Sequence, residues 1–143
     1  MATRADFRAQ REALGLAQQD VATALGVNIK TVKNWEKPGF QMPPDFAWDY
    51  LLEMKHRQDE MVWHNVAKVR EIAEAADGRM PKVVSISYFR TQSQYDECGR
   101  DEGPFGFANA ASRLAAEKLR RDGFYVEMRY PDDGAIPAKG SRY

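Results

Sequence analysis

The chain has few of the side chains that bind metals or form disulfides. Its 143 residues include one cysteine, Cys98, and two histidines, His56 and His64. A single cysteine excludes an internal disulfide framework, and two histidines without a third ligand are too few for the usual zinc sets. We therefore predict no metal site and no cofactor. Cys98 has no evident base beside it in the sequence, so a free thiol is expected, with a nucleophile as the alternative.

Long apolar runs are also missing. No stretch reaches the roughly 18 to 20 apolar residues of a membrane-spanning helix, and the first residues, MATRAD, lack the apolar region of a secretory signal. We therefore expect a cytoplasmic protein with no membrane partner. The length fits one domain, or one small module with an appendage.

The chain has no excess of one charge, because 21 Lys and Arg residues balance 21 Asp and Glu residues. It is therefore not a uniformly basic protein that coats any nucleic acid. The balance is uneven, however: residues 1–40 hold six bases and four acids, a net of +2, whereas residues 45–77 hold four bases and eight acids, a net of −4. A local basic surface is thus compatible with overall neutrality.

Three short helical patterns occupy the first forty residues. Apolar and small residues recur at helical spacing over 6–15 and over 17–25, and glycines are expected to end both helices at Gly15 and Gly26. A third helix is predicted from Asn28, whose side chain can cap the first turn, to about Lys37. The dipeptide Pro38-Gly39 then ends it.

The third predicted helix has two different sides. Val32 and Trp35 are three residues apart and are expected to face the core, whereas a basic stripe is formed by Lys30, Lys33 and Lys37. Two helices joined by a tight glycine-containing turn, the second with an exposed basic face, have the organisation of a DNA-binding helix-turn-helix. Three lysines taken alone are more often an ordinary solvated face.

The segment from Leu16 to Glu36, LAQQDVATALGVNIKTVKNWE, resembles the lambda-repressor-like (xenobiotic response element) family without a gap. The residues in register are Gln18, Ala22, Gly26, Thr31, Val32, Trp35 and Glu36. This resemblance implies a helical bundle whose partner is double-stranded DNA. It also implies an ion pair between Arg11 and Glu36 that ties the first helix to the third.

The resemblance implies roles for individual side chains. Gln18 is expected to bind a phosphate, and the whole predicted DNA-binding set is Gln18, Asn28, Ile29, Lys30, Thr31, Lys33, Asn34 and Lys37. Lysine is a flexible point charge and most often contacts phosphate. Lys30, in the first turn of the helix, is the predicted base reader.

The chain departs from the family pattern at two positions. Ala17 stands where the second helix usually has a capping Ser, Thr or Asn, which costs about 1 kcal/mol. Ile29 is apolar where the family often has a polar base reader, so contact with a thymine methyl is expected there. The operator sequence does not follow from these residues.

A long helical pattern follows MPP at 42–44, with Pro44 expected at the first helical position, and continues to Gly78 as one helix or two in tandem. Its apolar positions are Phe46, Tyr50, Leu51, Met54, Val62, Val66, Val69, Ala73 and Ala76.

Strands are predicted over 83–89 and 124–130, where β-branched and aromatic residues are frequent. A helix is predicted between them, because apolar residues have helical spacing at Phe107, Ala111, Leu114, Ala115 and Leu119, with Gly123 as its end. A long loop is expected between the first strand and this helix. Its glycine-rich stretch 97–106 lacks the order of a phosphate-binding loop, so that stretch is expected to be a flexible connection. A mobile tail is expected from Pro131.

The predicted fold is mainly α. Residues 1–77 form a lambda-repressor-like helix-turn-helix bundle with a long connecting helix, and residues 78–143 form a small β-α-β unit for dimerisation or partner binding. Two strands are marginal alone and leave open edges, so a homodimer is expected to complete the sheet or pack the helices. Such a dimer would present two recognition helices to an inverted repeat.

The predicted function is sequence-specific transcription regulation, with repression, including autoregulation, favoured. The chain also has a weaker similarity to the anti-CRISPR-associated autorepressors and their relatives. The similarity lies in the arrangement of the lambda-repressor-like module, a Pro-initiated helix, RMPK at 79–82 entering a strand, and then a short helix. It implies a regulator from a phage or mobile element that represses its own operon, with binding of messenger RNA as an additional option. An antitoxin of a toxin-antitoxin pair and a dual DNA/RNA-binding regulator remain alternatives. An enzyme is not predicted, because no catalytic constellation is visible.

Overall fold

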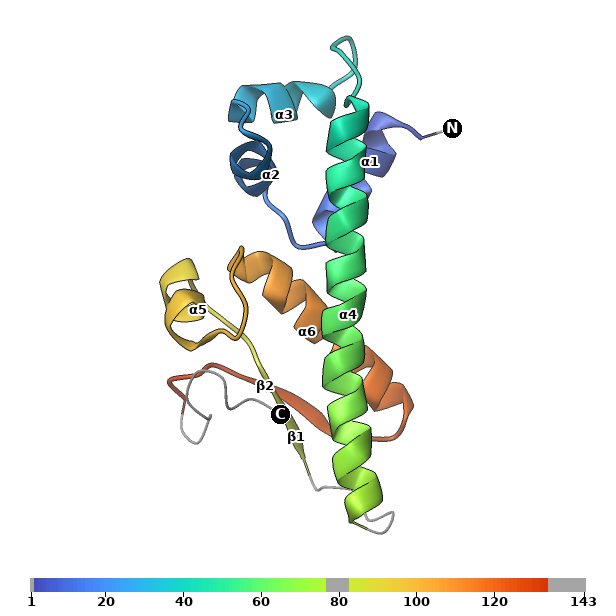
Figure 1. The fold of residues 1–143 in the computed structure, drawn as a ribbon, viewed down its shortest axis with the longest axis vertical. Helices are drawn as coiled ribbons and strands as arrows, with labels where there is room; N and C mark the ends of the chain where they lie inside the picture. The colour runs from blue at the N-terminus through green and yellow to red at the C-terminus, as the bar shows by residue number, and fades with distance from the viewer. Residues whose placement is uncertain (1, 77–82, 134–143) are drawn as a thin grey trace. The chain divides into compact units, whose positions relative to one another are not determined.

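The computed structural model describes residues 2–76 and 83–133. In these residues the elements follow in the order α1 (Arg4–Ala13), α2 (Gln18–Leu25), α3 (Ile29–Trp35), α4 (Asp45–Ala75), β1 (Val84–Ser87), α5 (Gln92–Cys98), α6 (Phe105–Arg121) and β2 (Val126–Arg129) (Figure 1). The predicted mainly α fold with a small strand-containing C-terminal unit is confirmed. The motif at 79–82 and the tail beyond Asp133 lie outside the described residues.

The chain divides into two compact units, residues 1–58 and 59–143. The long helical pattern forms a single helix, α4, which is one of the two forms expected from the sequence. The boundary between the two units lies within α4, whereas the sequence pattern placed it near residue 77. The reason is packing: Val62, Val66 and Val69 of α4 are buried in one cluster with residues of α6 and β1. The second half of α4 therefore belongs to the C-terminal unit.

The first helix starts two residues earlier than the sequence suggested, because Thr3 caps it. The Thr3 hydroxyl accepts a hydrogen bond from the Asp6 N–H at 3.1 Å, and the Asp6 carboxylate accepts one from the Thr3 N–H at 2.8 Å. This reciprocal capping box satisfies two backbone N–H groups at the end of the helix. The hydrogen bonds from Thr3 also lower the pKa of Asp6.

Aromatic side chains form the centre of the N-terminal unit. The Phe7 ring meets Trp35 edge-on at 6.0 Å and Trp48 at 5.1 Å, while Trp35 meets Phe46 at 6.0 Å. Edge-to-face pairs of this kind add to the stabilisation from burial. Trp35 is thus part of the core, as its spacing from Val32 predicted. Its contacts connect α1, α3 and the start of α4.

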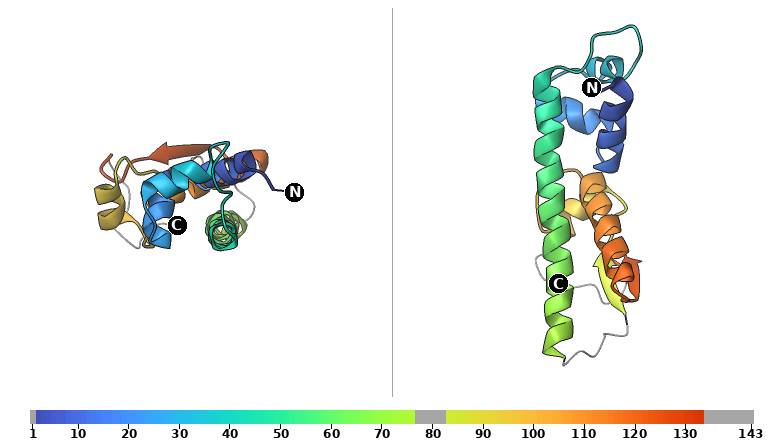
Figure 2. Two further views of the ribbon diagram at one scale, coloured as in Figure 1. Left: turned by 90° about the horizontal axis from the view of Figure 1, so that it is seen from above. Right: turned by 90° about the vertical axis from the view of Figure 1, so that its right-hand side faces the viewer.

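The C-terminal unit is a β-α-β arrangement covered by helices. β1 and β2 pair in parallel, with Val84 opposite Val126 and Ile86 opposite Met128. Figure 2 shows α6 running alongside the second half of α4, and their contact buries Ala115 of α6. The sequence alone does not show whether the two strands pair within one chain or between two chains. In the structure they pair within one chain.

The prediction of a long loop between the first strand and the following helix was wrong in part, because this region contains helix α5 (Gln92–Cys98). Thr91 caps this helix by accepting a hydrogen bond from the Gln94 N–H at 3.1 Å. Tyr95 then packs its ring against Phe89 at 4.9 Å. Only two apolar residues of the helix, Tyr95 and Cys98, mark a buried side, which is too short a pattern to identify a helix from the sequence.

None of the described helices combines the length and apolar character that crossing a bilayer requires. Helix α4 has 31 residues, but charged side chains occur along its whole length.

Candidate nucleic-acid interface

A sharp turn joins α2 to α3. Gly26 ends α2 with φ at +67°, in the left-handed region that glycine adopts without strain, and the following Val27 N–H returns to the Ala22 carbonyl at 3.0 Å. Two residues later Asn28 caps α3, because its side-chain oxygen accepts a hydrogen bond from the Lys30 N–H at 2.8 Å. The predicted cap is confirmed, and α3 starts immediately after the turn.

Helix α3 has one buried and one exposed side. Val32 is fully buried and Trp35 is 4 % exposed, so this side faces the core of the N-terminal unit. Lys30, Lys33 and, just beyond the helix, Lys37 are exposed. No ion-pair partner for these three lysines is found in residues 2–76 and 83–133, so their charges are not neutralised by the described part of the chain.

The remaining predicted DNA-binding side chains lie around this basic face. Ile29, Thr31 and Asn34 are half-buried on α3, Asn28 is exposed at its start, and Gln18 is half-buried as the first residue of α2. The predicted set therefore comes from one helix, its cap and the start of the helix before it.

The expected ion pair between Arg11 and Glu36 is present and is almost fully buried, with side chains 9 % and 3 % exposed. Arg11 donates from Nε to Glu36 Oε2 at 2.7 Å and from Nη2 to Oε1 at 2.9 Å. Its third donor, Nη1, reaches the Leu16 carbonyl in the α1–α2 connection at 2.9 Å. One guanidinium thus ties α1 to the turn before α2 and to the end of α3.

Gln18 joins the same network. Its side-chain amide donates to Glu36 Oε1 at 3.2 Å, so the first residue of α2 is linked to the residue that follows α3. A bidentate pair with additional hydrogen bonds is the geometry in which a buried charge pair is tolerated. The network fixes the start of α2, where Gln18 lies, against the end of α3, the helix that carries most of the other predicted DNA contacts.

Sequence reasoning missed the role of Arg4. Its guanidinium donates to the carbonyls of Trp35 at 3.3 Å and Gln41 at 3.1 Å, and also to that of Phe40. These bonds hold the connection between α3 and α4 against the start of α1. No local pattern in the sequence signals them, because the partners are backbone groups more than thirty residues away.

Helix α2 begins without a side-chain cap, as the departure at Ala17 predicted. Ala17 has no polar side-chain atom, and only the reverse bond of a capping box forms, from the Ala17 N–H to the Asp20 carboxylate at 2.8 Å. The first-turn N–H groups of α2 therefore have no side-chain acceptor at the cap position. These N–H groups lie at the end of α2 where Gln18 also lies.

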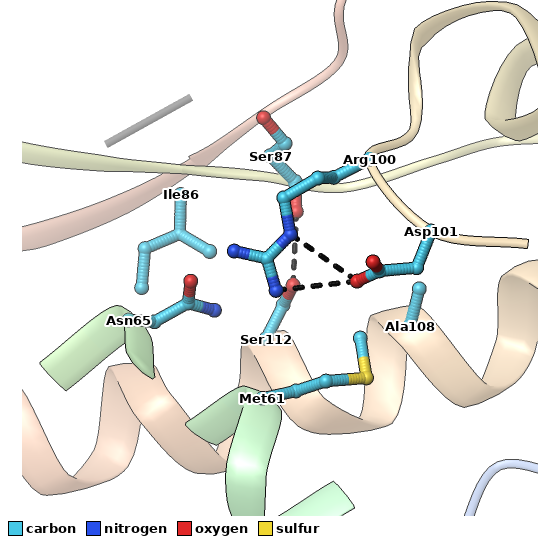
Figure 3. A pocket seen from close by; sticks show the side chains of 8 residues that line it. All are labelled: Met61, Asn65, Ile86, Ser87, Arg100, Asp101, Ala108 and Ser112. Carbon is cyan, nitrogen blue, oxygen red and sulfur yellow. Dashed lines mark hydrogen bonds and ion pairs between the residues drawn. The ribbon is translucent and has the colours of Figure 1, made fainter. Parts of the chain in front are cut away.

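The C-terminal unit contains a small pocket (Figure 3). It is lined by Met61, Asn65, Ile86, Ser87, Arg100, Asp101, Ala108 and Ser112. Its volume of about 30 Å³ is enough for about two water molecules and lies far below the roughly 300 to 1,000 Å³ of ligand pockets. The Arg100 guanidinium, which points over it, is already paired with Asp101 at 3.2 Å. A substrate-sized site is not formed here.

The side chains considered for metal or thiol chemistry are not assembled into a site. Across residues 2–76 and 83–133, no three His, Cys, Asp or Glu side chains come together in a group that could hold a metal ion. Cys98 is half-buried and packs against the cluster of Phe89, Tyr95 and Ala108. Burial, followed by the charges of Arg100 and Lys68, lowers the pKa of His64, so this imidazole is neutral at pH 7.

Comparison with protein-family models gives no match, and comparison with curated proteins gives none either. The likeness of the first three helices to a helix-turn-helix therefore depends on the residues and geometry of this chain.

Proposed function

We propose that this protein is a sequence-specific, double-stranded DNA-binding transcription regulator that acts as a homodimer. The observation that carries the proposal is the division of α3, which buries Val32 and Trp35 and exposes Lys30, Lys33 and Lys37 without ion-pair partners in the described chain. A short helix with this division, placed after a tight turn, is suited to the major groove of B-DNA.

In this proposal the lysines have two roles. Lys30 lies in the first turn of α3, where recognition helices contact base edges, and reads a base such as guanine through O6 and N7. Lys33 and Lys37 lie further along the exposed side and neutralise phosphates, which positions the helix without reading sequence. The charge of +2 over residues 1–40 supports attraction to DNA by this part of the chain.

The uncharged side chains refine the contact. Gln18, at the start of α2, binds a phosphate together with the uncapped N–H groups of that helix, since a helix N-terminus favours anions. Ile29 and Thr31 offer methyl groups to thymine, and Asn34 offers an amide that can pair with adenine. The Asn28 side-chain oxygen caps α3, and its side-chain N–H groups can donate hydrogen bonds to a phosphate.

A homodimer would place two such helices on an inverted repeat. Repression then follows from occupation of a promoter, including that of the gene for the protein itself. The proposal also includes a cytoplasmic location, an origin in a phage or mobile element, and no enzymatic activity.

The proposal is tested by selecting bound duplexes from a random DNA library with the purified protein at two salt concentrations. Recovery of an inverted repeat supports a symmetric, sequence-reading dimer. The variants Lys30→Ala and Lys33→Ala should then bind the selected site more weakly, whereas Lys118→Ala, on α6 in the other unit, should bind like the wild type. Folded α3 variants with wild-type affinity, or binding that only disappears with salt and selects no sequence, would contradict the proposal.

An antitoxin and a dual DNA/RNA-binding regulator are the alternative functions. Residues 59–143 hold 13 Lys and Arg against 14 Asp and Glu, a net of −1, so the charge of the C-terminal unit favours neither alternative. Co-expression with the product of a neighbouring gene, followed by size-exclusion chromatography, tests the antitoxin function.

A further inference from the structure

The two edges of the small parallel sheet differ. On β1, the N–H groups of Val84 and Tyr88 donate to β2, at the carbonyls of Tyr125 and Arg129, so the backbone of the odd-numbered residues faces the opposite edge. Side chains of α6 close that edge. Ser112 Oγ donates to the Ser87 carbonyl at 3.0 Å.

Asn109 of α6 completes the closure. Its side-chain oxygen accepts from the Phe89 N–H at 2.9 Å, and its side-chain nitrogen donates to the Phe89 carbonyl at 2.8 Å. This side chain makes the two hydrogen bonds that a residue of a neighbouring strand would make. The edge of β1 is therefore not available to another strand at this position.

The outer edge of β2 is different. Because Tyr125 and Arg129 direct their carbonyls to β1, the backbone groups of Val126, Met128 and Tyr130 point away from the sheet. Arg120 covers the Val126 carbonyl at 3.1 Å, and the Tyr130 carbonyl accepts from the Asp133 N–H at 3.0 Å. Among residues 2–76 and 83–133, however, β2 has β1 as its only neighbouring strand, and nothing meets the outward N–H and carbonyl of Met128. An open edge of this kind is a template for another strand.

The side chains of β2 alternate between its two faces. Val126 and Met128 are half-buried against the core of the C-terminal unit. Glu127 and Arg129 lie on the other face, 40 % and 41 % exposed, with Arg129 Nε 2.5 Å from Glu127 Oε1. Hydrogen bonds from Arg129 and Ser85 lower the pKa of Glu127, so this carboxylate is charged at neutral pH.

We infer that the outer edge of β2 pairs antiparallel with β2 of a second copy of this chain, with the two-fold axis at Met128. In this register Met128 faces itself and exchanges both backbone hydrogen bonds with its counterpart. Glu127 of one copy lies opposite Arg129 of the other, twice by symmetry. These positions form non-hydrogen-bonded pairs, in which facing side chains come closest.

The charges select this register over its neighbours. An axis at Glu127 would place two carboxylates opposite each other, and an axis at Arg129 would place two guanidinium groups opposite each other. Like charges directly opposite destabilise a strand pair. With the axis at Met128, the other face brings Met128 against its counterpart and Val126 against Tyr130, which extends the apolar core of each copy.

The dimer would have a four-stranded sheet. The two-stranded sheet of a single chain has only marginal stability by itself. The inference rests on the homodimer of the proposed function, and it names the surface that forms it. Its test measures association of the protein without DNA, so it can fail or succeed independently of DNA recognition.

Two single variants with opposite charge provide the test. Arg129→Glu makes both facing positions acidic, and Glu127→Arg makes both basic, so each variant alone opposes like charges across the axis. Sedimentation of each should give a dimer dissociation constant raised about tenfold or more over the wild type. An equimolar mixture should recover near wild-type affinity, because every facing pair is then of opposite charge.

Matched controls are available on α6, where Glu117 and Arg121 form an exposed pair at 2.8 Å. Glu117→Arg and Arg121→Glu carry the same charge changes away from the edge and should dimerise like the wild type. The inference is overturned if the wild type is monomeric at about 100 µM, a concentration at which weak dimers form, if the β2 variants dimerise like the controls, or if mixing them restores nothing.

Crosslinking gives a second measurement that does not depend on charge. In a Cys98→Ser background, Met128→Cys should form a disulfide-linked dimer on oxidation, because a hydrogen-bonded antiparallel pair has its Cα atoms about 5.5 Å apart, within disulfide range. Val126→Cys should not, because it faces Tyr130 of the other copy. Equal crosslinking of both variants would overturn the register. If the protein passes these tests but selects no DNA sequence, the proposed regulator function is contradicted and the proposed β2 dimer is supported.

Discussion

Arg11 of α1 holds Glu36, the residue after α3, through two hydrogen bonds of 2.7 and 2.9 Å between the guanidinium and both carboxylate oxygens. Both side chains are nearly inaccessible to solvent. Removal of one partner from a buried pair leaves an uncompensated charge, so Arg11→Ala should lower the free energy of unfolding by about 3 to 5 kcal/mol. Urea denaturation followed by circular dichroism measures the loss.

The exposed pair of Arg8 and Glu12 on the same helix serves as the control. It spans 3.5 Å, with side chains 62 % and 57 % exposed. Arg8→Ala should cost under about 1 kcal/mol, because exposed ion pairs contribute little. Similar losses for Arg8→Ala and Arg11→Ala would mean that the buried network does not stabilise the N-terminal unit.

The missing cap of α2 can be supplied. Ala17 has the extended backbone of a capping residue but no side-chain oxygen, while Asp20 already accepts from its N–H at 2.8 Å. Ala17→Ser should complete the capping box and raise the free energy of unfolding by about 1 kcal/mol. Thermal unfolding compares it with Ala17→Val, which offers no acceptor and should bring no gain. A serine variant no more stable than the valine one would show that the cap is not limiting.

Closure of the β1 edge predicts unequal costs for two neighbouring positions on α6. Asn109→Ala removes both hydrogen bonds to Phe89 in a buried setting and should cost about 3 kcal/mol of unfolding free energy, whereas Ser112→Ala removes one bond to Ser87 and should cost about 1 kcal/mol. Denaturant titrations of both variants measure the difference. Equal costs would mean that Asn109 acts as an ordinary polar core residue and not as a substitute strand.

Local sequence rules predicted the parts of the fold that depend on neighbours in the chain. Asn28 caps α3, Gly26 ends α2, and Val32 and Trp35 are buried, because capping, left-handed backbone and helical spacing are short-range effects. The mainly α class and both strands followed from the same kind of pattern.

The rest depends on tertiary contacts that no local pattern encodes. Arg4 binds backbone carbonyls of the α3–α4 connection, and Gln58, a polar residue that is 1 % exposed, donates to the Ala13 carbonyl at 3.2 Å. Helix α5 forms because Tyr95 has Phe89 to pack against. The unit boundary lies inside α4 for the same reason: which half of a helix packs where is decided by its partners.

The two proposed kinds of lysine contact differ in their response to salt. A phosphate contact releases counterions, so each one contributes about 0.9 to the slope of log K against log salt concentration, while a base contact contributes to sequence preference. Lys33→Ala and Lys37→Ala should each reduce the magnitude of this slope by about 1 and leave the selected sequence unchanged. Both side chains are exposed, so the fold should not be affected.

Lys30→Ala should behave differently, because this residue lies in the first turn of α3, beside the Asn28 cap. Its loss should cost about 1 to 3 kcal/mol of binding on the selected site and abolish the preference at one base pair. Fluorescence anisotropy over a series of salt concentrations, on the selected site and on single-base variants of it, measures both quantities. If Lys30→Ala changes only the slope, and Lys33→Ala changes the base preference, then α3 lies in the groove rotated from the orientation proposed above, with the middle of its exposed side toward the bases.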